Sequence, residues 1–221
     1  HEACKERWGK TPLQILDRYG VWDTRAIAAH CVWTTEEDWA LMAEKGVSCI
    51  HNPVSNLKLG SGVAWIPAMK RAGVNIALGT DGVSSNNNHD VFEEMKFAAI
   101  LHNGVTHDPL ALLPRQVLAM ATRDGARALG RRTGQIAPGY TADLILVDFD
   151  RPSLTPCHSV EDNLVYSARG SDVVMNMARG KIIYKDGTFF TLDLERIKAE
   201  VETYALPLLF GDGASPVSYT H

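Results

Sequence analysis

Three short apolar segments recur in the first 80 residues, and each is too short to be a helix. They cover residues 26–29, 47–50 and 74–78 and are apolar at nearly every position. Such a pattern is typical of a strand that is covered on both faces. Segments with helical signals separate the three, and this alternation indicates βαβ units. We therefore predict an α/β fold with a parallel sheet in this part of the chain.

The helices between and after these strands are predicted from the residues at their ends. Thr35 and Asp38 form a capping box, an apolar stripe follows, and Gly46 ends the helix. The next helix has Pro67 in its first turn and ends at Gly73. Three more helices are expected beyond the third strand. They cover residues 90–102, 109–120 and 123–129.

The sequence pattern changes near residue 134, where turn residues become frequent. Beyond it we predict a mostly β region followed by one amphipathic helix. The expected strands are residues 142–147, 173–178 and 182–184, and the expected helix is 194–204. The chain after Gly211 has no periodicity and is expected to be loose. We divide the chain into three parts, 1–134, 135–192 and 193–221.

Composition and charge exclude several classes of protein. Hydrophobic residues make up 45% and charged residues 22%, which fits a packed core and not disorder. The net charge is -4 without any basic run, so no nucleic-acid partner is expected. No apolar stretch approaches the roughly 18 residues of a membrane span, and no signal sequence opens the chain. Four scattered cysteines without a C-x-x-C pair are typical of a reducing compartment, so we expect a cytoplasmic protein without membrane contact.

Ionisable side chains follow the three predicted strands. The strands run into His30, into His51 and, through a short turn, into Asp81. Because the carboxyl ends of neighbouring parallel strands lie at one edge of a sheet, these groups are expected to share a pocket. Taken singly, each has a simpler interpretation, as a hydrogen-bonded structural histidine or an Asp-Gly turn. Their recurrence favours a shared site, and imidazole with carboxylate suits metal binding or proton transfer.

The motifs around these residues resemble the amidohydrolase superfamily. They read AAHC at 28–31, HNPVSNLKLGSG at 51–62 and ALGTDGVSSNN at 77–87. Within the superfamily they are most similar to the 5′-methylthioadenosine/S-adenosylhomocysteine deaminases, whose relatives are triazine chlorohydrolases and cytosine and guanine deaminases. Shorter motifs extend the resemblance over residues 5–204. They are FEEMK at 92–96, LGRRTGQI at 129–136, GYTADL at 139–144 and LVYSA at 164–168.

The resemblance implies a (β/α)8 TIM-type barrel with one divalent metal, most often zinc and sometimes iron, at the carboxyl ends of its strands. A small β-sandwich packs beside the barrel. This chain then supplies the carboxyl-terminal portion of the barrel and part of the sandwich. By the same resemblance, Asp81 is a catalytic metal ligand that shuttles a proton, and His30 is catalytic because it hydrogen-bonds the attacking hydroxide. His51, Asn52 and Asn56 match a motif that lines the substrate pocket.

The implied reaction is hydrolytic deamination of a purine nucleoside derivative. A divalent metal lowers the pKa of water to roughly 7, so that hydroxide is available to attack the ring carbon. Asp81 can take the proton of the water and return it to the departing ammonia, while His30 steadies the attacking oxygen. Four polar residues after Asp81 either fix its carboxylate or serve only as turn and capping residues. These are Ser84, Ser85, Asn86 and Asn87.

The match to the superfamily is incomplete. Its other metal ligands belong to an H-x-H pair and an H-x-x-E motif, and residues 1–134 contain neither. A whole barrel needs roughly 250 residues, whereas about 130 here are barrel-like, with three strands. Asp81 alone cannot hold zinc, which takes about three protein ligands. We therefore expect the carboxyl-terminal half of an enzyme, inactive in isolation.

Two further alternatives stay open at this point. The complete protein can instead act on guanine, cytosine or a chlorotriazine, because the groups that choose a substrate lie mostly on the absent half. The chain can also be a truncated, non-catalytic half-barrel that self-associates to cover its exposed edges. The expected partners are thus a small-molecule substrate and either a homo-oligomer or a chain with the missing amino-terminal half. The remaining histidines are interpreted as surface or packing residues. They are His89, His102, His107, His158 and His221.

Overall fold

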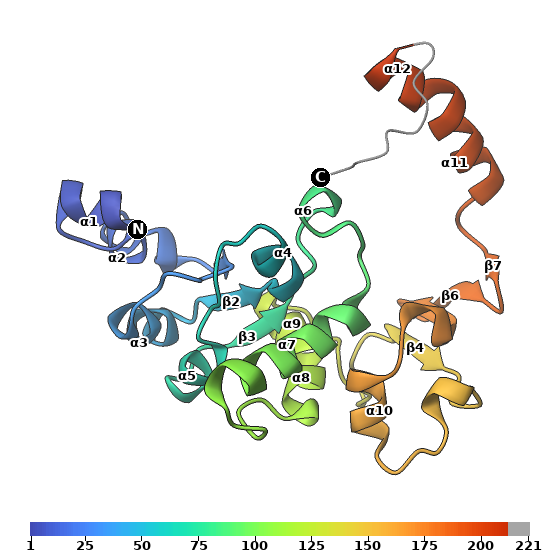
Figure 1. The fold of residues 1–221 in the computed structure, drawn as a ribbon, viewed down its shortest axis with the longest axis horizontal. Coiled ribbons are helices and arrows are strands. Elements are labelled where there is room, and N and C mark those ends of the chain that lie inside the picture. The colour runs from blue at the N-terminus through green and yellow to red at the C-terminus, as the bar shows by residue number, and fades with distance from the viewer. Residues whose placement is uncertain (212–221) are drawn as a thin grey trace.

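A computed structural model describes residues 1–211 of the chain and contains the predicted parallel sheet (Figure 1). Its strands, in the order β1-β2-β3, are β1 (Ile27–Ala29), β2 (Ser48–His51) and β3 (Ile76–Leu78). Ala29 pairs with Ile50, and Ile50 pairs with Ala77, so the three strands end at nearly the same level. The chain segments that follow the strands therefore emerge at one edge of the sheet, where the candidate residues lie.

Helices surround this sheet, and four of them, α5, α7, α8 and α9, contact β3. The predicted capping box of Thr35 and Asp38 is present at the start of α3, and Pro67 lies in the first turn of α5. The helices up to residue 128 are α1 (Glu2–Trp8), α2 (Pro12–Arg18), α3 (Glu36–Lys45), α4 (Pro53–Lys58), α5 (Ile66–Arg71), α6 (Val83–Asn86), α7 (Val91–Thr106), α8 (Pro114–Ala121) and α9 (Arg123–Ala128), with a 3-10 turn at Val21–Asp23.

The second sheet is antiparallel, with the order β4-β5-β6-β7. Its strands are β4 (Leu144–Val147), β5 (Val173–Ala178), β6 (Lys181–Lys185) and β7 (Thr188–Phe189). The turn at Arg179 and Gly180 joins β5 to β6, as predicted. Helix α10 (Val160–Tyr166) precedes this hairpin and packs against α7 and α8. Two 3-10 turns, Pro152–Leu154 and Gly170–Asp172, complete this region.

The hydrophobic core lies between the parallel sheet and the helices around it. Its fully buried large side chains come from α3, α5, β3, α8 and the loops beside them. They include Met42, Ile66, Met69, Ile76, Leu112 and Met120. The chain is α/β, with one parallel and one antiparallel sheet. The proposed division at residue 134 stays a prediction.

The predicted helix near the carboxyl end is present and longer than expected. It consists of α11 (Leu194–Glu200), a π-helical turn (Val201–Ala205) and α12 (Leu206–Phe210). In Figure 1 these segments project away from both sheets. No helix within residues 1–211 is long and apolar enough to cross a bilayer. The predicted loose tail beyond Gly211, with His221, lies outside the described residues.

Candidate active site

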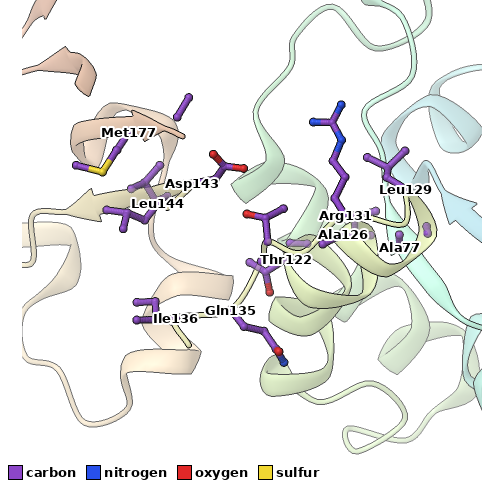
Figure 2. A pocket seen from close by; sticks show the side chains of 18 of the residues that line it. Ala77, Thr122, Ala126, Leu129, Arg131, Gln135, Ile136, Asp143, Leu144 and Met177 are labelled. Atoms are coloured by element: carbon purple, nitrogen blue, oxygen red, sulfur yellow. The ribbon is translucent and has the colours of Figure 1, made fainter. Parts of the chain in front are cut away.

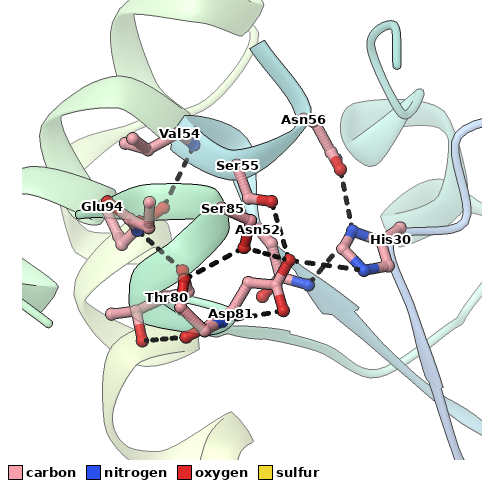
Figure 3. A network of polar contacts seen from close by, with 11 residues as sticks. His30, Asn52, Val54, Ser55, Asn56, Thr80, Asp81, Ser85 and Glu94 are labelled. Carbon is pink, nitrogen blue, oxygen red and sulfur yellow. Dashed lines mark hydrogen bonds and ion pairs between the residues drawn. The ribbon is translucent and has the colours of Figure 1, made fainter. Parts of the chain in front are cut away.

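The backbone adopts unusual torsion angles where β1 and β3 lead into the site. His30, Cys31 and Asp81 have positive φ values of 67°, 51° and 59°. This left-handed conformation costs a residue other than glycine about 1–3 kcal/mol and is concentrated at functional sites. Figure 3 shows the result, in which the His30 ring and the Asp81 carboxylate face each other across the ends of the strands. These backbone torsion angles set the direction in which the His30 and Asp81 side chains leave the strand ends.

Three hydrogen bonds hold the carboxylate of Asp81. The Ser55 hydroxyl donates to Oδ2 at 2.7 Å, the Ser85 hydroxyl donates to Oδ2 at 2.9 Å, and the Gly82 amide donates to Oδ1 at 2.8 Å. These bonds, that of Ser55 foremost, lower the pKa of Asp81 below its ordinary value. The side chain remains 33% exposed. An ionised and accessible carboxylate of this kind can bind a cation or accept a proton.

The His30 ring is oriented by an asparagine of helix α4. Its Nδ1 lies 2.8 Å from Oδ1 of Asn56, while Nδ2 of Asn52 is farther away, at 3.4 Å. Because the amide oxygen only accepts, Nδ1 carries the proton and Nε2 keeps a free lone pair. Nε2 lies 3.8 Å from Oδ2 of Asp81. The Nε2 atom of His30 is therefore directed toward the carboxylate of Asp81.

His51 occupies a different environment from His30 and Asp81. Its side chain is completely buried, and its Nε2 lies 3.2 Å from Nε2 of His102 on α7. Its Nδ1 has no partner within residues 1–211. The structure therefore brings together His30, Asp81, Asn52 and Asn56, whereas the ring of His51 is buried and lies against His102. A contact between His51 and substrate stays a prediction.

Acid unfolding is expected to depend on His102. Burial lowers the pKa of His102 to about 4, and burial with the neighbouring His102 and His30 lowers that of His51. The unfolded chain then binds protons more readily, so stability falls as the pH drops from about 6.5 to 4. The contribution of His102 to the free energy of unfolding falls by about 2 kcal/mol between pH 7 and pH 5.

Chemical denaturation of wild type and His102→Gln at pH 7 and pH 5 measures this loss. The buried Glu94 has its pKa raised to about 7, which stabilises the fold as the pH falls from about 7 to 4.5 and so opposes the histidines. Comparing variant with wild type isolates the histidine contribution, and the variant should lose less stability on acidification. The control is His107→Gln, an exposed histidine just after the same helix. Equal pH dependence in wild type and His102→Gln would contradict this account.

Several participants were not singled out from the sequence. Ser55 lies inside the motif at 51–62, which carries no separate signal for its contact with Asp81. Of the two interpretations of Ser85, the structure shows the one in which it donates to the Asp81 carboxylate. Glu94 and His102 lie in the buried face of α7. An ionisable residue in an otherwise apolar helical stripe is the signal that identifies such positions.

A wide apolar cavity of about 950 Å³ lies elsewhere, between the two sheets (Figure 2). The parallel sheet contributes Ile27, Ile50 and Ala77 to its wall, and the antiparallel sheet contributes Ile145 and Met177. None of the residues around Asp81 and His30 lines it. The cavity is therefore separate from the candidate active site.

The residues present fit one part of a metal site. The carboxylate of Asp81 and the Nε2 atom of His30 are both groups that can bind zinc. Within the described chain, however, no group of three His, Cys, Asp or Glu side chains is placed to hold a metal ion. The sequence has one H-x-x-E match at 158–161, but His158 and Glu161 are both exposed at the start of α10, remote in sequence from the strand ends. A complete site needs further ligands from elsewhere.

The parallel sheet, with an aspartate and a histidine at its carboxyl edge, is an arrangement that hydrolytic metalloenzymes of the α/β class use. The comparison with family models agrees, since residues 1–183 match the amidohydrolase family. The chain belongs to this family.

Two similar proteins in sequence are deaminases. A 5′-deoxyadenosine deaminase of Methanosarcina mazei is 49% identical over 207 residues, which cover 94% of this chain and 48% of the relative. A 5-methylthioadenosine/S-adenosylhomocysteine deaminase of Moorella thermoacetica is 50% identical over 202 residues, covering 90% and 47%. The chain thus spans about half the length of these curated relatives.

Solved structures of amidohydrolases are also similar to this chain. An adenosine deaminase from Xanthomonas campestris with bound zinc superposes with a TM-score of 0.88 and 39% identity, over 92% of this chain and 47% of that chain. An atrazine chlorohydrolase from Arthrobacter aurescens complexed with zinc has a TM-score of 0.84 and 27% identity, over 90% and 45%. The family assignment made from the motifs is confirmed, and the chain superposes on about half of each of these two amidohydrolase structures.

Proposed function

We propose that this chain is the carboxyl-terminal half of a metal-dependent hydrolytic deaminase for adenosine derivatives such as 5′-deoxyadenosine, methylthioadenosine or adenosylhomocysteine. The observation that carries the proposal is the pair of Asp81 and His30, whose Oδ2 and Nε2 atoms face each other at 3.8 Å. The deaminases among its relatives, at 49% and 50% identity, support this substrate class over triazines, where identity is 27%. The longer chain that contains these residues is called the complete protein below.

In this proposal Asp81 has two tasks. Its carboxylate is one ligand of a divalent metal, with zinc as the first choice because two related structures contain it. When bound, such an ion lowers the pKa of water to roughly 7 and so makes hydroxide available near neutral pH. Asp81 accepts the proton of the attacking water, since Ser55, Gly82 and Ser85 keep it ionised. It then returns this proton to the departing amino group.

His30 positions the attacking water in this reaction. Since Asn56 holds the Nδ1 proton, Nε2 is free to accept a hydrogen bond from water beside Asp81. An acceptor fixed in that direction orients the oxygen for attack on the ring carbon that bears the amino group. Asn52 and Asn56 are both buried and close to Nδ1 of His30, so they stabilise this orientation. In this proposal they also line the substrate pocket.

The other half of the enzyme supplies the remaining ligands and covers the apolar surface. Sheet order leaves β1 as an edge strand, and its residue Ile27 is 48% exposed. An exposed apolar edge strand favours pairing with further strands. We propose that an amino-terminal half of the same barrel occupies this edge, and that residues 135–192 belong to a small β-sandwich. The cytoplasm is the compartment that we expect for this enzyme.

An assay of ammonia release by the complete protein tests this function. Adenosine derivatives are expected to be deaminated, activity should be lost on chelation and restored by zinc, and the 221-residue chain alone should be inactive. Guanine, cytosine and atrazine serve as competing substrates. Release of ammonia or chloride from one of these, with none from adenosine derivatives, would replace the proposed substrate class. A complete protein that only self-associates and turns over none of them would support a non-catalytic role.

A further inference from the structure

Glu94 is a buried carboxylate that contacts two separate loops of the candidate site. It lies on α7 with no exposed surface. Its Oε2 accepts a hydrogen bond from the backbone amide of Val54 at 3.3 Å, and its Oε1 accepts one from Nδ2 of Asn86 at 2.5 Å. Figure 3 shows Glu94 beside the start of α4 and next to the Asp81 turn.

Each of these two contacts leads directly to a residue of the site. Val54 immediately precedes Ser55, which donates to Asp81, and is close in sequence to Asn56, which orients His30. Asn86 uses the same Nδ2 to donate to the backbone carbonyl of Thr80 at 2.7 Å. The segment after β2, which includes the start of α4, and the segment after β3, which includes α6, are therefore attached to the two oxygens of one side chain. These segments, residues 52–56 and 80–86, are called the two loops below.

The environment of Glu94 shows that its own burial is unfavourable. Burial raises the pKa of its carboxyl group to about 7, against the opposing effect of the hydrogen bonds from Val54 and Asn86. No Lys, Arg or His within residues 1–211 forms an ion pair with it. An unpaired carboxylate in an apolar helix face is costly to bury, so its presence requires another reason.

We propose that Glu94 is a positioning residue, which sets the separation of the two loops and thereby aligns His30 with Asp81. It acts through Asn86 and the Val54 amide and does not touch substrate. Its effect on turnover rests on the proposed function, whereas its effect on the loops does not.

The test is Glu94→Gln in the complete protein. Glutamine has the same shape, but one of its two terminal atoms is an amide nitrogen that cannot accept a hydrogen bond, so one loop is released. The matched control is Glu93→Gln, because Glu93 is adjacent on the same helix and, among residues 1–211, its side chain accepts a hydrogen bond only from Asn88. Removing such a supporting hydrogen bond typically costs about 10–100-fold in activity. We expect kcat to fall by that factor in Glu94→Gln while KM changes little, and both to stay unchanged in Glu93→Gln.

Two further measurements separate positioning from general destabilisation. Amide hydrogen exchange should accelerate in residues 52–56 or 80–86 of Glu94→Gln and stay unchanged in β2 and β3. The double variant Glu94→Ala/Asn86→Ala should lose less kcat than the product of the two single effects, because each single change breaks the same hydrogen bond between Glu94 and Asn86. Unchanged exchange in both loops, or multiplying effects in the double variant, would overturn the proposal. If the wild-type complete protein has no deaminase activity, only the proposed function is contradicted. The hydrogen-exchange measurement still tests the role of Glu94.

Discussion

The Asp81→Asn variant of the complete protein is expected to lose roughly 10³-fold or more in kcat, within the range that general acid–base catalysis supplies. Asparagine keeps the size of the side chain and can accept the hydrogen bonds from Ser55 and Ser85 at one atom only. It cannot accept a proton near neutral pH, and it binds a divalent cation less strongly because it is uncharged. Steady-state kinetics and metal analysis of the purified variant measure both effects.

Asp186→Asn is the matched control for this substitution. Asp186 is an exposed aspartate at the turn between β6 and β7, and it also has a positive φ, of 47°. An effect of Asp→Asn on folding stability at a positive φ would therefore appear in both variants, whereas loss of the reacting carboxylate affects only Asp81→Asn. Normal turnover in Asp81→Asn would remove this residue from the site.

His30→Ala is expected to lower kcat by about 10²-fold while the zinc content stays close to that of the wild type. Removal of the ring leaves Asn56 without its partner and the attacking water without an orienting acceptor. The carboxylate of Asp81, with its three hydrogen bonds, is untouched. Kinetics and zinc analysis of the same preparation make the comparison direct.

The control for this variant is His107→Ala, since His107 is exposed and also has a positive φ, of 55°. It should retain wild-type activity. An equal loss of zinc and of activity in His30→Ala would show that His30 is itself a metal ligand. An unchanged rate would contradict the role that we assign to it.

The sequence predicted the elements that leave clear local signals. The strands ending near His30 and Asp81 follow from short apolar runs, and α3 follows from its capping box. Helix α4, with six residues, and α6, with four, are too short to show helical periodicity and were missed. Helix α10 was missed as well, although Ser159 caps its start.

The orientation of His51 could not be predicted, for a physical reason. A strand covered on both faces is apolar at nearly every position, so it carries no alternation that assigns each side chain to a face. The sequence placed His51 at the correct edge of the sheet, but its burial against His102 depends on α7, 51 residues away along the chain. The bridging role of Glu94 is equally non-local, because α4, α6 and α7 meet only in the folded chain.

Anomalous diffraction at the zinc edge, from crystals of the complete protein, tests the central claim most directly. We predict a single strong peak at about 2.0–2.2 Å from a carboxylate oxygen of Asp81, within reach of His30 and of ligands from the other half. A zinc peak in an active enzyme that lies away from Asp81, or an active enzyme that contains no divalent metal, would contradict it.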